Sequence, residues 1–137
     1  MDKIERILLV DDSNATNFYN KRIIQKTELV TEILTAKNGS EALDYLKAGI
    51  IPQMIFLDVN MPVMNGWEFI IEYQKLNEEY KRSIIILMLG TALDENDREF
   101  AENTSEIREF QDKILTKEIV CNMVTKYFDH VTSTMCS

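Results

Sequence analysis

The chain has 137 residues, a length that fits one domain and leaves little room for a second. Apolar residues make up 45% of it and charged residues 28%, which is the balance of a folded globular protein rather than a disordered one. The formal net charge of −8 argues against nucleic acid as the main partner, because phosphate binding needs clustered lysine and arginine.

Neither the first residues nor the apolar runs indicate a membrane protein. Residues 1–6 are charged and lead straight into an apolar run, without the layout of a signal peptide. The longest apolar run, 84–89, is too short to span a bilayer. Cys121 and Cys136 lack the spacing of a zinc site. We expect them to be two reduced thiols in a cytoplasmic protein.

Short apolar runs alternate with amphipathic stretches along the chain. Residues 7–10 form the first apolar run, which predicts a buried strand. In the stretch 14–26, helical spacing is shown by Ala15, Phe18, Tyr19, Arg22 and Ile23. Residues 31–36 are typical of a second strand, and Ser40 is placed to act as the N-cap of a helix over 41–48.

The second half of the chain repeats this alternation. Residues 54–57 form a third apolar run, and the stretch 67–78 has an apolar helical face made by Phe69, Ile70, Tyr73 and Leu76. The continuous aliphatic run 84–89 suits a strand buried on both faces, as in a parallel sheet. Residues 94–102 then predict a short helix, and residues 107–110 a weak fifth strand.

The last helix is predicted to follow Thr116, a residue type that caps helices. Its apolar stripe consists of Ile119, Val120, Met123, Val124, Tyr127 and Phe128. Residues 131–137 predict a frayed tail outside a domain that spans residues 1–130. The five strand–helix units, joined by short connections, predict an α/β fold: a doubly wound five-stranded parallel sheet with helices on both faces.

Polar groups follow the predicted strands at the points where they end. They are Asp11 and Asp12 after the first, Asp58 after the third, Gly90 and Thr91 after the fourth, and Lys113 after the fifth. Because ligands bind beyond the carboxyl ends of parallel strands, we expect these groups to share one site. Clustered carboxylates repel each other unless a cation intervenes, and Mg²⁺ suits such oxygen ligands.

These groups match the needs of phosphoryl transfer. A carboxylate can be the nucleophile, while a metal ion and a lysine neutralise the developing charge and a hydroxyl binds a further oxygen. Each group also has an ordinary alternative. The Asp11–Asp12 pair could form a turn or cap a helix, and Thr91 could cap the next helix. Asp58 could be a loop acid, and Lys113 could be a solvated lysine. The joint placement at strand ends favours the shared site.

Three segments carry a resemblance to a known family. The segment Leu57–Gly66, with the sequence LDVNMPVMNG, resembles the phosphoacceptor loop of response-regulator receiver domains. Residues 7–13 and 38–43 resemble the start and the second-helix entry of the same family, and the likeness covers residues 4–128. The resemblance implies a CheY-like, flavodoxin-like fold and a single-domain regulator of a two-component system.

The resemblance also implies a role for each matching residue. Asp58 would accept a phosphoryl group from the phosphohistidine of a histidine kinase or phosphotransfer protein. Asp12, assisted by Asp11 and completed by Asp58 and the backbone carbonyl of Asn60, would hold Mg²⁺. Lys113 would pair with the phosphoryl oxygens. Such a protein is a regulator rather than an enzyme and acts through a downstream protein, without a nucleic-acid or membrane partner.

Two positions depart from the family pattern. The family places threonine or serine directly after the fourth strand; counted without a gap that position is Gly90, and Thr91 takes it only if the strand end shifts by one residue. Ile114 stands where the family usually has proline, often with a cis peptide bond. A non-proline cis bond costs roughly 3 kcal/mol, so we expect the peptide between Lys113 and Ile114 to be trans, with a strained cis peptide as the alternative.

Other interpretations stay open. Gly90 and Ile114 would also suit a degenerate receiver that serves as a phosphorylation-independent binding module. A phosphatase similar to haloacid dehalogenases would share the aspartate nucleophile, but that family has a second aspartate where this chain has Asn60. A flavodoxin-like cofactor binder would share the fold alone. The aromatic residue through which the family often binds partners maps to Phe110 or to its neighbour Glu109.

Overall fold

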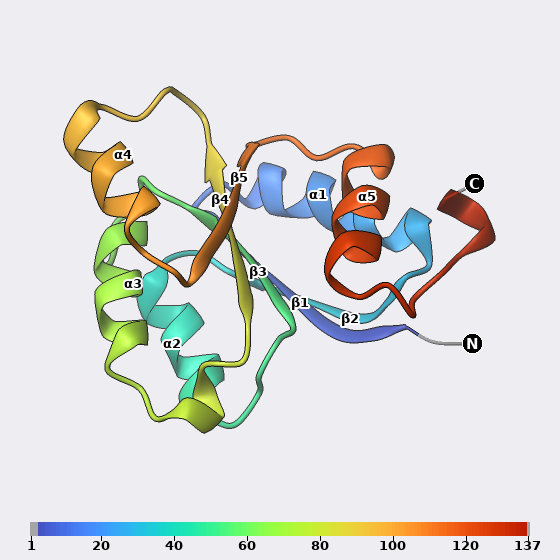
Figure 1. Ribbon diagram of the computed structural model, residues 1–137, viewed down its shortest axis with the longest axis horizontal. Coiled ribbons are helices and arrows are strands. Elements are labelled where there is room, and N and C mark those ends of the chain that lie inside the picture. Colours follow the sequence, from blue (N-terminus) through green and yellow to red (C-terminus); the bar gives the residue numbers. More distant parts are fainter. Residues whose placement is uncertain (1–2, 137) are drawn as a thin grey trace.

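Five strands in the described part of the chain form one parallel sheet in the order β2-β1-β3-β4-β5 (Figure 1). They are β1 (Ile4–Val10), β2 (Val30–Ala36), β3 (Met54–Asp58), β4 (Ile84–Leu89) and β5 (Ile107–Asp112). The computed structural model describes residues 3–136. The order matches the doubly wound parallel sheet that the alternating sequence pattern predicts, so the fold class is confirmed.

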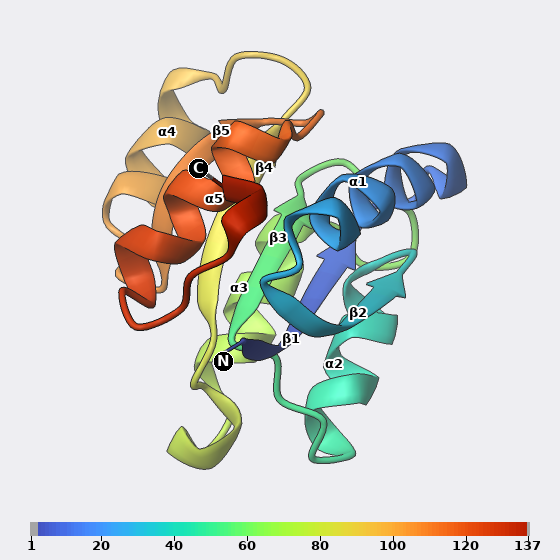
Figure 2. The same ribbon diagram turned by 90° about the vertical axis from the view of Figure 1, so that its right-hand side faces the viewer.

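Helices cover both faces of this sheet, as Figures 1 and 2 show. One face carries α1 (Asn14–Thr27) and α5 (Lys117–Tyr127). The other carries α2 (Gly39–Lys47), α3 (Gly66–Gln74) and α4 (Glu95–Glu102). Two short 3₁₀ turns, η1 (Glu78–Tyr80) and η2 (Thr134–Cys136), complete the described elements. In residues 3–136, no helix combines the length and apolar character that crossing a bilayer requires.

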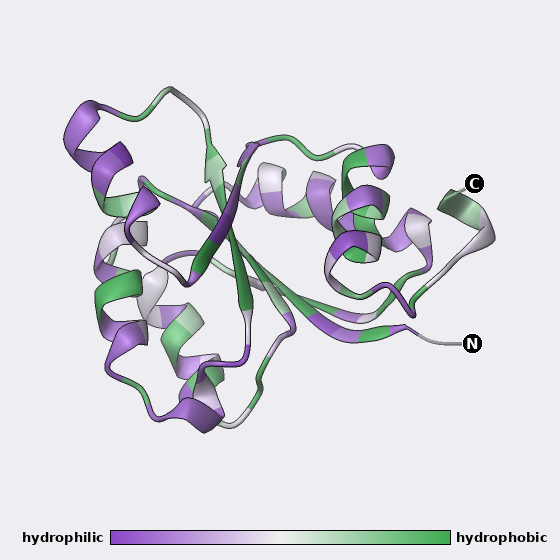
Figure 3. Cartoon of the chain, viewed as in Figure 1, coloured by the Kyte–Doolittle hydropathy of each residue, from purple (hydrophilic) through white to green (hydrophobic). Residues whose placement is uncertain are grey.

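Two apolar clusters lie on either side of the sheet, and the central strands contribute to both. Leu8, Ile55 and Leu87 face the cluster under α2 and α3. Their neighbours Ile7 and Phe56 face the cluster under α1 and α5. Strands that are buried on both faces need apolar residues at consecutive positions, which explains the green central strands in Figure 3.

Asparagine side chains set the start of two helices. Asn38, rather than the predicted Ser40, caps α2: its Oδ1 accepts a hydrogen bond from the N–H of Glu41 at 2.9 Å, and the helix begins at Gly39. Asn65 and Glu68 form a reciprocal capping box at the start of α3. That helix ends at Gln74, so the predicted end at residue 78 is wrong.

The buried face of α1 differs from the one that its apolar residues suggest. Phe18 and Tyr19, whose spacing predicts the helix, are 64% and 46% exposed. The buried residues of α1 are instead Asn17, Asn20, Ile24 and Thr27. The helix therefore turns three polar side chains inward, and each of them forms hydrogen bonds with backbone groups.

The C-terminal residues do not form the predicted frayed tail. Val131 is fully buried in the cluster beneath α1 and α5. Cys136 forms a disulfide with Cys121 of α5, so the expectation of two reduced thiols is also wrong. This bond fastens residues 128–136 to the domain. Residue 137 of the predicted tail lies outside the described part of the chain, as do residues 1 and 2.

Candidate functional site

Three carboxylates converge beyond the carboxyl ends of β1 and β3. These strands are neighbours, and Val10 pairs with Leu57, which places Asp11 beside Asp58. One oxygen from each of Asp11, Asp12 and Asp58 lies within 4.8 Å of the others. Asp11 and Asp58 are buried, whereas Asp12 is exposed. The structure thus brings together the carboxylates that the strand-end argument predicts.

Lys113 enters the same cluster from the end of β5. Its Nζ lies 3.2 Å from Oδ2 of Asp58 and 3.4 Å from Oδ2 of Asp11. The ordinary alternative of a freely solvated lysine is therefore wrong. Oδ2 of Asp58 is buried, and its close contact with Lys113 is an ion pair rather than a hydrogen bond. The other oxygen of Asp58 accepts the N–H of Val59 at 2.9 Å.

Burial, more than mutual repulsion, sets the pKa of the two buried carboxyl groups. Burial raises the pKa of Asp58 above its usual value, and the ammonium group of Lys113 only partly offsets this rise. Burial also raises the pKa of Asp11, although the N–H of Ser13 stabilises its charged form. Burial alone would lower the pKa of Lys113, but the two facing carboxylates raise it. By charge count, one ammonium group faces three carboxyl groups in this cluster.

The residues present fit a divalent cation. An all-oxygen set of three carboxylates, with the backbone carbonyl of Asn60 in the loop after Asp58, is the donor chemistry that Mg²⁺ prefers. The predicted residues that would hold the ion are therefore Asp11, Asp12, Asp58 and Asn60.

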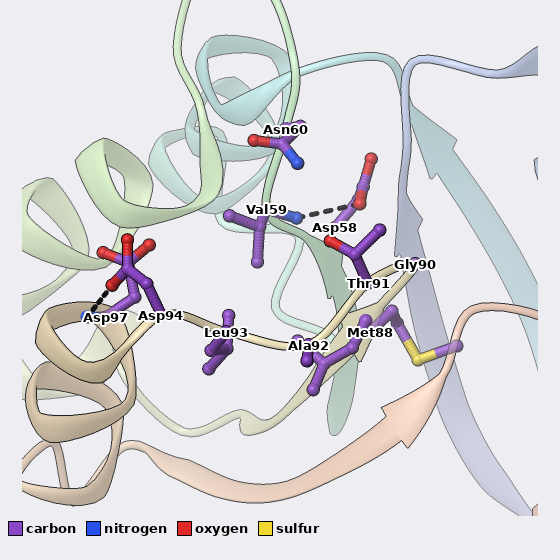
Figure 4. Close-up of a pocket in the computed structure, with 11 residues that line it drawn as sticks. Asp58, Val59, Asn60, Met88, Gly90, Thr91, Ala92, Leu93, Asp94 and Asp97 are labelled. Carbon is purple, nitrogen blue, oxygen red and sulfur yellow. Dashed lines mark hydrogen bonds between the residues drawn. The ribbon is translucent and has the colours of Figure 1, made fainter.

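A groove of about 180 Å³ opens beside Asp58, between the loops that follow β3 and β4 (Figure 4). Gly90 and Thr91, in the loop after β4, line it together with Asp58. Asp94 caps α4, so the alternative role of Thr91 as that helix cap is wrong. The alternative that the Asp11–Asp12 pair caps α1 is also wrong, because Ser13 does so.

The loop that carries Lys113 has a feature that sequence reasoning missed. The described chain contains no cis peptide bond, so the predicted trans peptide between Lys113 and Ile114 is confirmed. Asn20 of α1 donates from Nδ2 to the carbonyl oxygen of Lys113 and accepts at Oδ1 from the N–H of Leu115, each at 3.0 Å. The available signal was an asparagine three residues after Asn17, on the stripe that continues with Ile24.

The loop between β3 and α3 is held closely against the site. The N–H of Gly66 donates to the carbonyl oxygen of Val59 at 2.8 Å, and the N–H of Gly39 donates to that of Met64 at 2.9 Å. A Cβ on Gly66 would lie 2.5 Å from the backbone oxygen of Asp58, so only glycine fits there. At the exposed tip of this loop, Val63 has a φ of +67°.

The two residues predicted for the partner-binding position on β5, Phe110 and Glu109, have different neighbours. Phe110 is partly buried against the cluster beneath α2, α3 and α4. Glu109 accepts hydrogen bonds from Lys126 at 2.9 Å and from the hydroxyl of Tyr127, and so ties β5 to α5. Arg108 also lies over the ring of Tyr127. Phe110 stays the predicted aromatic residue for partner contact, since Glu109 is engaged within the chain.

Comparison with known proteins identifies the family. The response regulator receiver domain family matches residues 7–125. A protein-glutamate methylesterase/protein-glutamine glutaminase from Methanococcus maripaludis is 31% identical over 130 residues. The matched region covers 84% of this chain and 34% of that protein, so this chain spans about a third of its relative.

Solved structures agree with the family match. A two-component response regulator from Cytophaga hutchinsonii superposes with a TM-score of 0.81 and 33% identity, over 93% of this chain and 98% of that one. The chemotaxis response regulator CheY4 of Vibrio cholerae gives a TM-score of 0.72 and 26% identity, over 90% and 98% of the two chains.

Proposed function

The chain belongs to the response regulator receiver domain family, and on that premise we propose that it is a phosphoacceptor phosphorylated on Asp58. The observation that carries the proposal is the state of Oδ2 of Asp58. This oxygen is buried, accepts no hydrogen bond and lies 3.2 Å from the ammonium group of Lys113. Its lone pairs are therefore available for attack on an electrophile.

The proposed reaction is an in-line displacement at phosphorus. A carboxylate oxygen of Asp58 forms a bond to the phosphorus of a phosphohistidine, and the bond between phosphorus and the imidazole nitrogen breaks. The electron pair leaves with the imidazole, which then takes a proton from water. Lys113 neutralises charge on the phosphoryl oxygens from its position beside Asp58. Bound at the carboxylates, Mg²⁺ would supply further positive charge to those oxygens.

Thr91 supplies the hydroxyl group that we propose for a phosphoryl oxygen. It lines the groove beside Asp58, whereas Gly90, at the ungapped position of the family pattern, has no side chain to offer. A contact of Thr91 that exists only in the phosphorylated form would favour that form and draw the loop after β4 toward the site. The hydroxyl group that binds the phosphoryl oxygen would then stand one residue later in this chain than in the family pattern.

We propose a histidine kinase or phosphotransfer protein as the donor, a downstream protein as the recipient of the signal, and the cytoplasm as the location, where ATP-derived phosphohistidine is made. The face formed by α4, β5 and α5, with Phe110 on β5, is the proposed contact surface for the downstream protein.

Mass spectrometry of the intact protein tests the proposal. We expect a gain of one phosphoryl group after incubation with Mg²⁺ and a small acyl-phosphate donor, and no gain without Mg²⁺ or in the Asp58→Asn variant. Asp97→Asn is the matched control, because Asp97 lines the same groove without belonging to the carboxylate cluster, and it should be modified normally. Modification of Asp58→Asn at the wild-type level would contradict the assignment.

Gly90 also supports a second candidate function, a degenerate receiver that binds partners without switching. The fluorescence of the single tryptophan, Trp67, can distinguish the two candidate functions. The ring of Trp67 packs edge-on against that of Phe100 of α4, with ring centroids 5.5 Å apart. If phosphorylation moves the loop after β4 and the α4 helix behind it, the fluorescence of Trp67 should change. Full phosphorylation with an unchanged fluorescence spectrum would favour the degenerate receiver.

A further inference from the structure

Asn20 is a buried polar residue whose side chain forms hydrogen bonds with a segment that is distant in the sequence. It lies on α1, is 4% exposed, and bonds to backbone groups more than 90 positions away in the chain. Its amide N–H donates to the carbonyl oxygen of Lys113, and its amide oxygen accepts the N–H of Leu115. The two hydrogen bonds therefore bracket a single residue, Ile114.

Ile114 gives this loop little support of its own. Its side chain is 52% exposed, and its peptide bond with Lys113 is trans. A proline would fix one backbone angle of the loop, and isoleucine does not. Nevertheless Nζ of Lys113 lies 3.2 Å from Asp58 and 3.4 Å from Asp11. Contacts other than those of Ile114 must therefore fix the backbone conformation at Lys113 and with it the direction of the lysine side chain.

We propose that Asn20 is a positioning residue that fixes the aim of Lys113 at Asp58, an inference that rests on the proposed phosphoacceptor function. Lys113 reaches Asp58 through a long, flexible side chain, so a small rotation of its backbone displaces the ammonium group. The two hydrogen bonds from Asn20 oppose this rotation by holding the peptide groups on both sides of Ile114.

The chemistry of the amide suits this role. The loop presents one acceptor and one donor at once, and among side chains of this size asparagine supplies both complementary groups. An aspartate would keep the acceptor for the N–H of Leu115 but lose the donor to Lys113. A leucine has nearly the same shape and supplies neither, so it would leave two buried backbone groups without partners.

The same helix also holds the acidic side of the site. Asn17, one turn before Asn20, donates to the carbonyl oxygen of Asp11 at 2.9 Å. The backbone of an acid and the backbone of the lysine are thus anchored to amides three residues apart on α1. A rigid helix that holds both segments sets their separation, which explains why α1 buries asparagines in place of its aromatic residues.

The test compares phosphorylation rates in a double-mutant cycle. We expect Asn20→Leu to slow phosphorylation by a small acyl-phosphate donor about tenfold or more at saturating Mg²⁺. Lys113→Ala should slow it to a similar degree, and the double variant should be no slower than Lys113→Ala alone. The Mg²⁺ affinity, measured by calorimetry, should stay within about twofold of wild type in Asn20→Leu, because the carboxylates keep their positions.

The matched control is Thr27→Val, at the far end of the same helix. Thr27 is also fully buried, and its hydroxyl donates to the carbonyl oxygen of Ile24 at 2.7 Å. This variant loses a buried hydrogen bond of α1 away from the site, so it should lower the melting temperature without slowing phosphorylation. If Asn20→Leu does not fold, Asn20→Asp, which retains one of the two hydrogen bonds, takes its place in the cycle.

Two results would overturn the inference. One is a wild-type rate in Asn20→Leu or Asn20→Asp. The other is a double variant slowed relative to Lys113→Ala by as much as Asn20→Leu is slowed relative to wild type, because Asn20 would then act independently of the lysine. A wild-type protein that takes no phosphoryl group at all, from the small donor or from a kinase, would instead refute the proposed function on which the inference rests.

Discussion

Cys121 of α5 and Cys136 of η2 are joined by a disulfide, and the loop of chain that it closes contains the fully buried Val131. The two cysteines are 15 positions apart, and a crosslink over such a loop stabilises a fold by about 3 kcal/mol in the chain-entropy model. We expect Cys136→Ser to lower the unfolding free energy by about 2–3 kcal/mol in urea denaturation.

The control for this prediction is a reducing agent. Reduced wild type should match Cys136→Ser, and the variant itself should not respond to the reductant. Equal stability of oxidised and reduced wild type would show that the bond contributes nothing to the fold.

The same substitution, glycine to alanine, should destabilise the protein at Gly66 but not at Gly90. A Cβ on Gly66 would lie 2.5 Å from the backbone oxygen of Asp58, so Gly66→Ala should displace that backbone and cost about 1–3 kcal/mol of stability. A Cβ on Gly90 would meet only Cδ of Lys113, at an ordinary 3.6 Å. Gly90→Ala should therefore stay within about 0.5 kcal/mol of wild type. Chemical denaturation of the two variants in parallel measures both effects, and similar losses would contradict the prediction.

Val63 holds a backbone conformation that β-branched residues avoid. Its φ is +67°, and its side chain is 82% exposed, so little packing compensates for the strain. Val63→Asn should raise the unfolding free energy by roughly 1 kcal/mol, because asparagine tolerates the left-handed region. Val63→Ala, which removes the β-branched methyl groups but is not asparagine, should raise the unfolding free energy by less. The thermal midpoints of the three proteins provide the comparison, and a less stable asparagine variant would count against the strain.

Glu109 should contribute to stability in a pH-dependent way. Burial alone would raise its pKa, but the hydrogen bonds from Tyr127 and Lys126 outweigh burial and hold the pKa below the ordinary glutamate value of 4.5. A carboxyl group with a lowered pKa stabilises the fold above its unfolded-state pKa, and this contribution disappears as the pH falls through the folded-state value. The stability difference between wild type and Glu109→Gln should therefore be constant near neutral pH and shrink below about pH 4.5. A difference independent of pH would rule out this linkage.

The sheet and the carboxylate cluster follow from local sequence patterns. Aliphatic runs such as residues 84–89 identify central strands, and the acids at the ends of β1 and β3 meet because those strands are neighbours. The approach of Lys113 is predictable for a related reason, although β5 extends to Asp112 rather than to residue 110. One edge of the sheet collects the strand ends, so position along the chain indicates proximity.

The features that could not be predicted from the sequence depend on contacts between distant segments. Asn20 looks like a solvent-facing residue until its partners beyond β5 are known. Phe18 is expected in the core but is exposed. Helical spacing identifies residues that share a face of a helix, but it does not tell which face is buried. Cys121 and Cys136 give no sign of pairing, because only the path of residues 128–136 back over α5 brings them together.

The position of β5 at the edge of the sheet has a consequence for the balance of charge in the site. Asp11 and Asp58 belong to strands that pair directly, whereas Lys113 follows β5, which pairs with β4. Separation of this edge strand from β4 would leave the two buried carboxylates in place and remove the ammonium group that faces them. The electrostatic balance of the site is thus tied to the docking of the last strand.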